Sequence, residues 1–338
     1  MEQSARAPRD APRAPRHPLE VKPLSSNARF KQSRYDIFNL IPCKNYYVAS
    51  SGGGKNSAAI SAIEAMFPLF SSFAVFSHTI KVDPSFDGLL AKIKKKLEQQ
   101  DMDPEDPENE YRFESLAELP RVMHKQQQVI KEERDQGKAS LSQLCVYIDD
   151  MLGDLRFNKH LDALYSRGRH IGCSVFLTSQ VFRGASSTIR KNIDNLVCFR
   201  LNQTEYQSVR EEVIGADIDT EAFDELYKRG TAGPHDFLVI KLTERDPAMK
   251  FCRNYTHRLI VSKDVCFSKW ADWKSCSAST SGPATGSAQT QTCVKRIGSR
   301  TSPAGSGSRK ARVAILSART PLSCSTCNPL VFPATVCA

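Results

Sequence analysis

The glycine-rich segment at residues 48–57 constrains this chain most, because few backbones can adopt the conformation that it encodes. It reads Val-Ala-Ser-Ser-Gly-Gly-Gly-Lys-Asn-Ser, continues an apolar run at 45–50 and leads into helically spaced apolar residues at 57–70. Glycines let several backbone N–H groups point into one cavity, where a helix N-terminus and a lysine add positive charge for phosphate. The strand–loop–helix context therefore predicts a nucleotide phosphate-binding loop. Its predicted ligand-binding residues are Ser51, Gly52, Gly53, Gly54, Lys55, Asn56 and Ser57.

Two positions of this loop depart from the pattern G-x-x-x-x-G-K-S/T. Ala49 replaces the first glycine, which is a mild change because that position mainly needs a small residue. Asn56 replaces the hydroxyl residue that binds Mg²⁺. Three interpretations stay open: the Asn56 oxygen binds the ion, Ser57 does so from a shifted helix start, or metal binding is weak and nothing is hydrolysed. A flexible loop without a ligand is the alternative for a Gly-Gly-Gly-Lys run, and the flanking strand and helix disfavour it.

An acidic pair follows an apolar run about 95 residues after the loop. Residues 145–150 read Cys-Val-Tyr-Ile-Asp-Asp, so both carboxylates belong at the end of a buried strand, the edge where open α/β sheets bind ligands. Asp149 is the predicted magnesium ligand. Asp150 takes the place where many ATPases use Glu to polarise the attacking water, although its side chain is one methylene shorter. Two solvated acids in a turn are the alternative.

Polar residues near the next strand complete the predicted site. Gln180 ends the run at 173–180, where an amide can contact the γ-phosphate or the attacking water and so report hydrolysis. A surface glutamine is the alternative, and the favoured one for this residue taken alone. Ring ATPases commonly need an arginine from the neighbouring subunit to neutralise charge in the transition state. Arg169 is the first candidate for this finger and Arg190 the second, with a surface or DNA-facing cation as the alternative for each.

Apolar runs alternate with helical patterns from about residue 44 onward, which predicts a mainly parallel α/β sheet. The predicted strands lie at 45–50, 73–79, 144–151, 173–180 and 195–201. Predicted helices lie at 57–70, 86–100, 114–137 and 220–230, with a surface loop at 101–110 and a terminal hairpin formed by 235–242 and 249–255. This order describes one three-layer α/β domain of the P-loop NTPase kind, about five strands plus the hairpin, at residues 35–262.

Charge separates this domain from two tails. Residues 1–34 carry a net charge of +5 and residues 266–338 a net charge of +8, whereas 35–265 carry −3. The Ala-Pro-Arg repeats of residues 1–34 and the Ser/Thr/Gly-rich residues 263–338 bury too little apolar surface to fold, so both are predicted to be disordered. Any general attraction to nucleic acid must therefore come from the tails or from local clusters. The lysines of 92–96 form one such cluster, for which a solvated helix face is the favoured interpretation.

Cysteine usage favours a reduced, intracellular setting. Five cysteines lie in or beside strand-like runs, where the side chain behaves as a small apolar group. Cys324 and Cys327 form a lone C-x-x-C without a second pair or a neighbouring histidine, too few ligands for zinc. No apolar run reaches the length of a membrane span, and the N-terminus lacks the apolar core of a secretion signal. An Arg-rich transit peptide is a minor alternative; nucleus, cytoplasm or a virion remains the expected location.

The combined motifs resemble the viral genome-packaging ATPases of the poxvirus and large DNA virus type, in the FtsK–HerA class of P-loop motors. The resemblance covers about residues 37–256 and rests on the runs GGGKNS, VYIDDM, SRGRHIGCSVFLTSQ, IRKN, HDFLVIKL and KFCRNY. Its specificity lies in the combination of an Asp-Asp pair, an Arg-His about 20 residues later, and a strand that ends in Ser-Gln. Family members carry Ser or Thr after the lysine, where this chain has Asn56.

The resemblance implies an ATPase that uses ATP and Mg²⁺ and threads double-stranded DNA through a homo-oligomeric ring, without sequence readout. The implied roles are phosphate binding by Lys55, magnesium binding by Asp149, water activation by Asp150, sensing by Gln180 and a finger at Arg169 or Arg190. A catalytically inactive, domesticated relative that binds nucleotide or DNA as a structural protein is the second hypothesis. A nucleotide kinase or helicase is the third, disfavoured because neither a lid-like arginine cluster nor a second helicase domain is evident.

Overall fold

A ten-stranded sheet forms the centre of the computed structural model, which describes residues 29–35, 41–151, 153, 158–214, 218–262 and 312–317. Its strand order is β12-β11-β10-β9-β8-β2-β7-β6-β3-β4. The strands from β8 to β4 run parallel to their neighbours, and those from β8 to β12 are antiparallel. The parallel strands are β2 (Lys44–Val48), β3 (Ser72–Ser77), β4 (Arg112–Phe113), β6 (Leu144–Asp149), β7 (Cys173–Ser179) and β8 (Asn195–Cys198).

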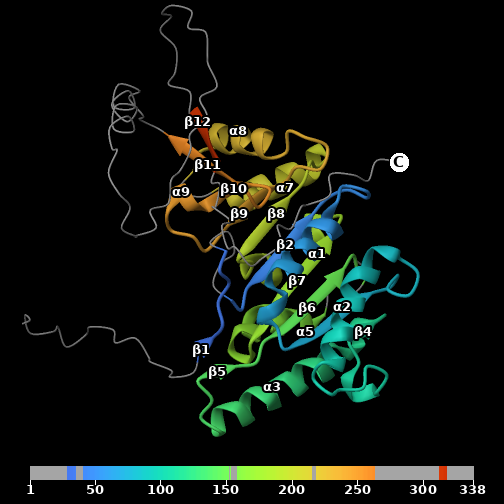
Figure 1. The fold of residues 1–338 in the computed structure, drawn as a ribbon. Coiled ribbons are helices and arrows are strands. Elements are labelled where there is room, and N and C mark those ends of the chain that lie inside the picture. The colour runs from blue at the N-terminus through green and yellow to red at the C-terminus, as the bar shows by residue number, and fades with distance from the viewer. Residues whose placement is uncertain are drawn as a thin grey trace, which may run out of the picture.

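The antiparallel part extends the sheet beyond β8 (Figure 1). It consists of β9 (Leu238–Lys241), β10 (Phe251–Arg253), β11 (His257–Ser262) and β12 (Arg312–Ser317). A separate two-stranded sheet pairs β1 (Arg29–Phe30) with β5 (Ser140–Leu141). The predicted hairpin of residues 235–242 and 249–255 is thus confirmed as β9 and β10.

Helices cover both faces of the sheet, because side chains alternate across each strand and both faces are apolar. Tyr46 and Val48 face a core with α5, α7 and α8, whereas Tyr47 faces a core with α1 and α2. The longer helices are α1 (Lys55–Met66), α2 (Asp87–Glu98), α3 (Leu119–Asp135), α5 (Lys159–Arg167), α7 (Gln203–Val213) and α8 (Thr220–Gly230). Short helices are α6 (Ser187–Lys191), α9 (Pro247–Lys250), η1 (Phe67–Leu69), η2 (Pro84–Phe86), η3 (Pro107–Asn109), η4 (Leu116–Glu118), η5 (Gly168–Ile171) and η6 (Phe182–Gly184). The predicted three-layer α/β architecture with a mainly parallel sheet is confirmed.

The two predicted tails mostly fall in residues 1–28, 263–311 and 318–338, outside the described ranges. Residues 312–317, which were assigned to the C-terminal tail, instead form β12, paired with all six residues of β11. The domain boundaries at 35 and 262 stay predictions. Within the described ranges no helix is long and apolar enough to cross a membrane.

All five cysteines that the sequence placed near strands are buried free thiols, as predicted. Burial raises the pKa of the Cys43 thiol to about 11, so it stays protonated at neutral pH and packs as an apolar group. Cys324 and Cys327 lie outside the described residues.

Candidate nucleotide-binding site

The glycine-rich loop joins β2 to α1 at the carboxyl edge of the parallel strands (Figure 1). Gly54 precedes the helix with φ 94°, a left-handed conformation that strongly favours glycine. At Gly53 a Cβ would lie 3.0 Å from both the Ala49 Cβ and the Ser50 carbonyl oxygen. The backbone of this loop therefore requires glycine at two positions for reasons of conformation and space.

Lys55 is the first residue of α1 and is 8% exposed. Its Nζ lies 3.6 Å from Oδ2 of Asp150, which follows β6. A lysine and a carboxylate separated by 95 residues in sequence thus meet at the carboxyl edge of the sheet, where the sequence predicted that they would meet.

Asp149 is anchored by hydroxyls from both neighbouring strands. Ser77 of β3, Asp149 of β6 and Thr178 of β7 are adjacent in register. The Thr178 hydroxyl donates to Asp149 Oδ1 over 2.6 Å, and the Ser77 hydroxyl donates to Oδ2 over 3.4 Å. Burial raises the pKa of Asp149, against the opposing effects of the Thr178 hydrogen bond and the positive charge of Lys55. A further positive charge at this edge would therefore be stabilising.

Asp150 has an unusual backbone for a residue other than glycine. Its φ is 46°, in the left-handed region, and its N–H donates to the Thr178 carbonyl over 3.1 Å. The Gln180 amide donates to Asp150 Oδ2 over 2.5 Å. Lys55 and Gln180 thus converge on one carboxylate oxygen, and Gln180 lies beside the acidic pair as expected from its place at the end of β7.

Two buried oxygens of the site have no hydrogen-bond partner among the described residues: Asn56 Oδ1 and Asp150 Oδ1. Such atoms are rare in folded proteins, because an unsatisfied buried acceptor is destabilising. Asn56 is the second residue of α1, whereas Ser57, the alternative ligand, is exposed. Carboxylate and amide oxygens are the ligands that Mg²⁺ prefers, and the ion usually takes only one or two carboxylates from the protein. The oxygens of Asn56 and Asp149 are therefore of the kind that would suit a magnesium ion.

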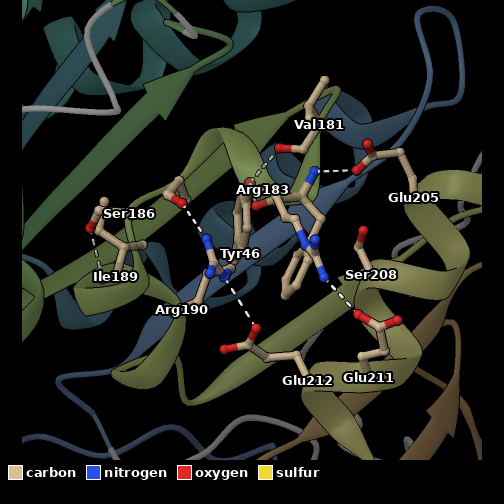
Figure 2. A network of polar contacts seen from close by, with 12 residues as sticks. Tyr46, Val181, Arg183, Ser186, Ile189, Arg190, Glu205, Ser208, Glu211 and Glu212 are labelled. Atoms are coloured by element: carbon tan, nitrogen blue, oxygen red, sulfur yellow. Dashed lines mark hydrogen bonds and ion pairs between the residues drawn. The ribbon is translucent and has the colours of Figure 1, made fainter.

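Arg190 lies in a polar network with residues of the loop after β7 and of α7 (Figure 2). Its guanidinium donates to the Ala185 carbonyl over 2.6 Å, pairs with Glu212 of α7 at 3.3 Å and lies over the Phe182 ring at 5.7 Å. The side chain is only 16% exposed. Within this chain, these contacts fix Arg190 between the loop after β7 and α7.

Arg169 lies in η5, before the first residue of β7 and thus at the amino edge of the sheet. It pairs with the buried carboxylate of Asp194, whose other oxygen accepts from the Lys44 N–H over 2.9 Å. The Arg169 side chain is still 48% exposed. Because β7 spans seven residues, about 20 Å separate this edge from the carboxyl edge, so Arg169 does not join the other site residues of its own chain.

The lysine cluster of α2 is partly engaged within the chain. Lys92 pairs with Glu64 at 2.5 Å, Lys94 with Glu105 at 3.6 Å, and Lys96 donates to the Phe70 carbonyl. These contacts agree with the interpretation of a solvated helix face.

Two residues on the far side of the loop were not predicted from the sequence. A Cβ placed on Gly54 would lie 3.6 Å from both Phe199 Cε1, just after β8, and His235 Nδ1, just before β9. In the sequence, Phe199 falls within the predicted strand at 195–201 and His235 begins the predicted hairpin strand at 235–242, and neither position indicates a contact with a loop some 145–180 residues earlier.

Comparison with known proteins agrees with the resemblance noted from the sequence. Residues 108–215 match the sequence model of a family described as Poxvirus A32 protein, which confirms the similarity to poxvirus-type packaging ATPases. This match covers less than half of the chain; it includes Asp149, Asp150 and Gln180 but not the glycine-rich loop. No curated protein sequence matches the chain.

Several solved structures are similar to this chain at low identity. The genome packaging NTPase B204 of Sulfolobus turreted icosahedral virus 2, solved with ATP-gammaS, has 15% identity and a TM-score of 0.43, over 63% of this chain and 97% of B204. EssC (ATPases 2 and 3) from Geobacillus thermodenitrificans has 13% identity and a TM-score of 0.40, over 60% of this chain and 38% of EssC.

Proposed function

We propose that this chain is an ATPase that moves double-stranded DNA, of the kind that packages viral genomes. The observation that carries the proposal is the convergence of Lys55, Asp150 and Gln180 beside a glycine-rich loop and the buried carboxylate of Asp149. Phosphoryl transfer needs such a set: a cationic cradle for the phosphates, a carboxylate that orients the attacking water, and a polar group that contacts both. The match to the poxvirus A32 family supports packaging as the setting.

In this proposal Lys55 exchanges its contact with Asp150 for the β- and γ-phosphates of ATP. Asp150 then accepts a hydrogen bond from the attacking water and takes up its proton, while Gln180 orients that water from the neighbouring strand. The present contact of Lys55 and Gln180 with the same oxygen keeps the Asp150 carboxylate in place between turnovers. Hydrolysis is thereby reported to the loop that follows Gln180.

Asn56 and Asp149 would hold the magnesium ion that accompanies ATP. We prefer Asn56 to Ser57, because Asn56 presents a buried oxygen without a partner and Ser57 is exposed. When bound, the ion supplies positive charge that neutralises the phosphate oxygens.

A neighbouring copy of this chain would supply the arginine finger, and Arg169 suits that role better than Arg190. Arg169 is half-exposed and too far from its own loop to act there, so it would act on an adjacent subunit of a ring. Arg190 is mostly buried in contacts with its own α7.

DNA contact would be through backbone phosphates and would rely on local cations or on the basic tails, since residues 35–265 are slightly acidic. An intracellular, virion-related location follows from this role.

ATP hydrolysis by the full chain and by Lys55→Ala tests the proposal. The lysine variant should lose hydrolysis by at least about a hundredfold, because it lacks the main cationic contact to the phosphates. Lys92→Ala, which removes a surface lysine of α2, is the matched control and should keep full activity. Activity that survives in Lys55→Ala would show that the site is elsewhere.

The second candidate function, a nucleotide-binding protein without hydrolysis, is favoured by Asn56 and would be indicated by ATP binding without turnover.

A further inference from the structure

The nucleotide site has two sides, and the groups proposed for hydrolysis occupy only one of them. In the sheet order, β7 and β6 lie on one side of β2 and carry Gln180, Asp149 and Asp150 at their ends. On the other side of β2 lie β8 and then β9. A triphosphate whose γ-phosphate faces the acidic pair, and whose chain runs along the loop away from that pair, would direct its nucleoside toward β8 and β9.

Two side chains from that direction lie against the loop. Phe199 directly follows β8, and its N–H donates to the Val48 carbonyl, which places it beside the end of β2. A Cβ added to Gly54 would meet His235 Nδ1 at 3.6 Å, the same distance as to the Phe199 ring. The His235 side chain is exposed, and no hydrogen bond or ion pair joins it to another residue of the described ranges.

His235 is nevertheless held in place through its backbone neighbours. The carboxylate of Asp236 accepts hydrogen bonds from the Gly233 N–H at 2.7 Å, the Asn254 amide at 2.9 Å and the Arg253 guanidinium at 2.5 Å. Although partial burial opposes ionisation, the hydrogen bonds from Asn254, Arg253 and Gly233 lower the pKa of Asp236, so the carboxylate is charged at neutral pH. We call these three hydrogen bonds the Asp236 clamp. They connect the segment before β9 to Arg253 of β10 and to the following residue, Asn254.

An aromatic cluster fixes the hairpin to the helix of the loop. The ring of Phe237 lies 5.0 Å from Phe199 and 5.0 Å from Tyr255. The Tyr255 hydroxyl donates to the Ala58 carbonyl, in the first turns of α1, over 3.1 Å. The position of His235 relative to Gly54 is therefore set by packed elements on both sides of it.

We propose that His235 is a nucleotide-binding residue that contacts the nucleoside end of ATP, beside the buried ring of Phe199. This inference rests on the proposed nucleotide site. An exposed, unpartnered imidazole on a fixed backbone offers a nucleobase both a stacking face and a hydrogen-bonding edge. The Asp236 clamp and the aromatic cluster account for the fixed backbone, but they do not account for an imidazole that is exposed beside the loop.

Binding of two ligands to the full chain tests the inference: ATP, and inorganic tripolyphosphate, which has the phosphates without the nucleoside. His235→Ala should weaken ATP binding about tenfold, the effect of one base–aromatic contact, and leave tripolyphosphate binding unchanged. His124→Ala is the control, because His124 is an exposed histidine on α3 at the amino edge of the sheet. His235→Gln, which keeps a polar side chain, serves if the alanine variant does not fold.

Equal weakening of both ligands, or weakening of neither, would overturn the inference. A failure of the proposed nucleotide site would differ from this result, because the unchanged protein would then bind neither ATP nor tripolyphosphate.

Discussion

Burial of the Asp149 carboxylate lowers the stability of the fold at neutral pH, and the same carboxylate is the proposed magnesium ligand. Buried charges in binding sites often combine these two properties. The folded-state pKa of Asp149 is raised, chiefly by burial, so the folded protein holds the proton more tightly than the unfolded chain. The stabilising contribution of this group is therefore complete below its ordinary pKa of 3.8 and is lost as the pH rises through the raised value. At neutral pH the ionised carboxylate destabilises the fold.

Asp149→Asn should accordingly stabilise the protein at pH 7 while it abolishes hydrolysis. The amide keeps the shape of the side chain and still accepts from Thr178, and the melting temperature should rise by about 2–4 °C, as for ~1 kcal/mol in a domain of this size. Thermal unfolding over a series of pH values measures this, and the gain should shrink as the pH approaches 3.8. A variant that melts lower at pH 7 would contradict the assigned effect of burial.

Asn56 is the residue on which the proposed activity depends most. Asn56→Ala removes a buried oxygen proposed to face magnesium, so it should weaken ATP binding about tenfold in Mg²⁺ and little in EDTA. Titration of ATP under both conditions measures the difference. Ser57→Ala is the matched control at the exposed neighbouring position. If Ser57→Ala carries the magnesium-dependent loss instead, the ligand assignment is wrong.

The sequence predicted most of this site because its residues sit at strand ends. Lys55, Asp150 and Gln180 were expected at one sheet edge from the strand pattern alone, and they meet there. Their individual roles stay predictions. His235 was not foreseeable in the same way, because its contact with Gly54 depends on how the hairpin packs beside β8 rather than on any local pattern.

At the scale of elements, the loop after β7 and helix α7 are joined by three acidic side chains (Figure 2). Glu205 accepts from the Phe182 N–H at 2.6 Å, Glu211 pairs with Arg183 and Glu212 pairs with Arg190. If Gln180 moves during the proposed hydrolysis cycle, we expect these contacts to transmit the movement to α7.

Arg190 and Arg183 should differ sharply in this network. Arg190→Ala leaves a buried carbonyl and a half-buried carboxylate without a partner, so it should cost about 1–3 kcal/mol of folding free energy. Arg183→Ala removes an ion pair between two exposed side chains and should change stability by less than about 1 kcal/mol. Chemical denaturation of both variants tests the contrast. Equal, small effects would reopen the finger role for Arg190.

The strand and helix pattern of the parallel half followed from hydrophobic periodicity, whereas other elements did not. Helix α8 was predicted at its observed residues, and β2, β3, β6, β7 and β8 lie within or close to their predicted runs. Helix α7 was missed because its residues are mostly polar and only a few are buried. Strand β12 contains a short apolar run at 313–316, but the run lies in a Ser/Thr/Gly-rich range that was assigned to the tail, and its pairing with β11 shows that it is a strand.

At the scale of the whole molecule, Arg169 lies too far from the glycine-rich loop of its own chain to act there. Its proposed finger role therefore requires a neighbouring subunit, and this requirement can be tested. Arg169→Lys keeps a cation beside Asp194 but lacks the guanidinium fork, and it should lose hydrolysis about a hundredfold or more. Lys55→Ala should be inactive too. A mixture of the two inactive variants should regain activity, because an intact loop from one subunit then meets an intact arginine from another.

The control is each variant alone, at the same total protein concentration as the mixture. If mixing restores nothing although the subunits associate, Arg169 does not act across a subunit boundary, and its pairing with Asp194 is its main role.

The central claim is that ATP hydrolysis at this site drives movement along DNA, and one measurement tests it most directly. Magnesium-dependent ATP hydrolysis by the full chain should be measured with and without long double-stranded DNA, with Lys55→Ala alongside. Hydrolysis should rise severalfold with DNA, should not depend on the DNA sequence and should be absent in the variant. Folded protein that binds ATP but hydrolyses none, with or without DNA, would contradict it.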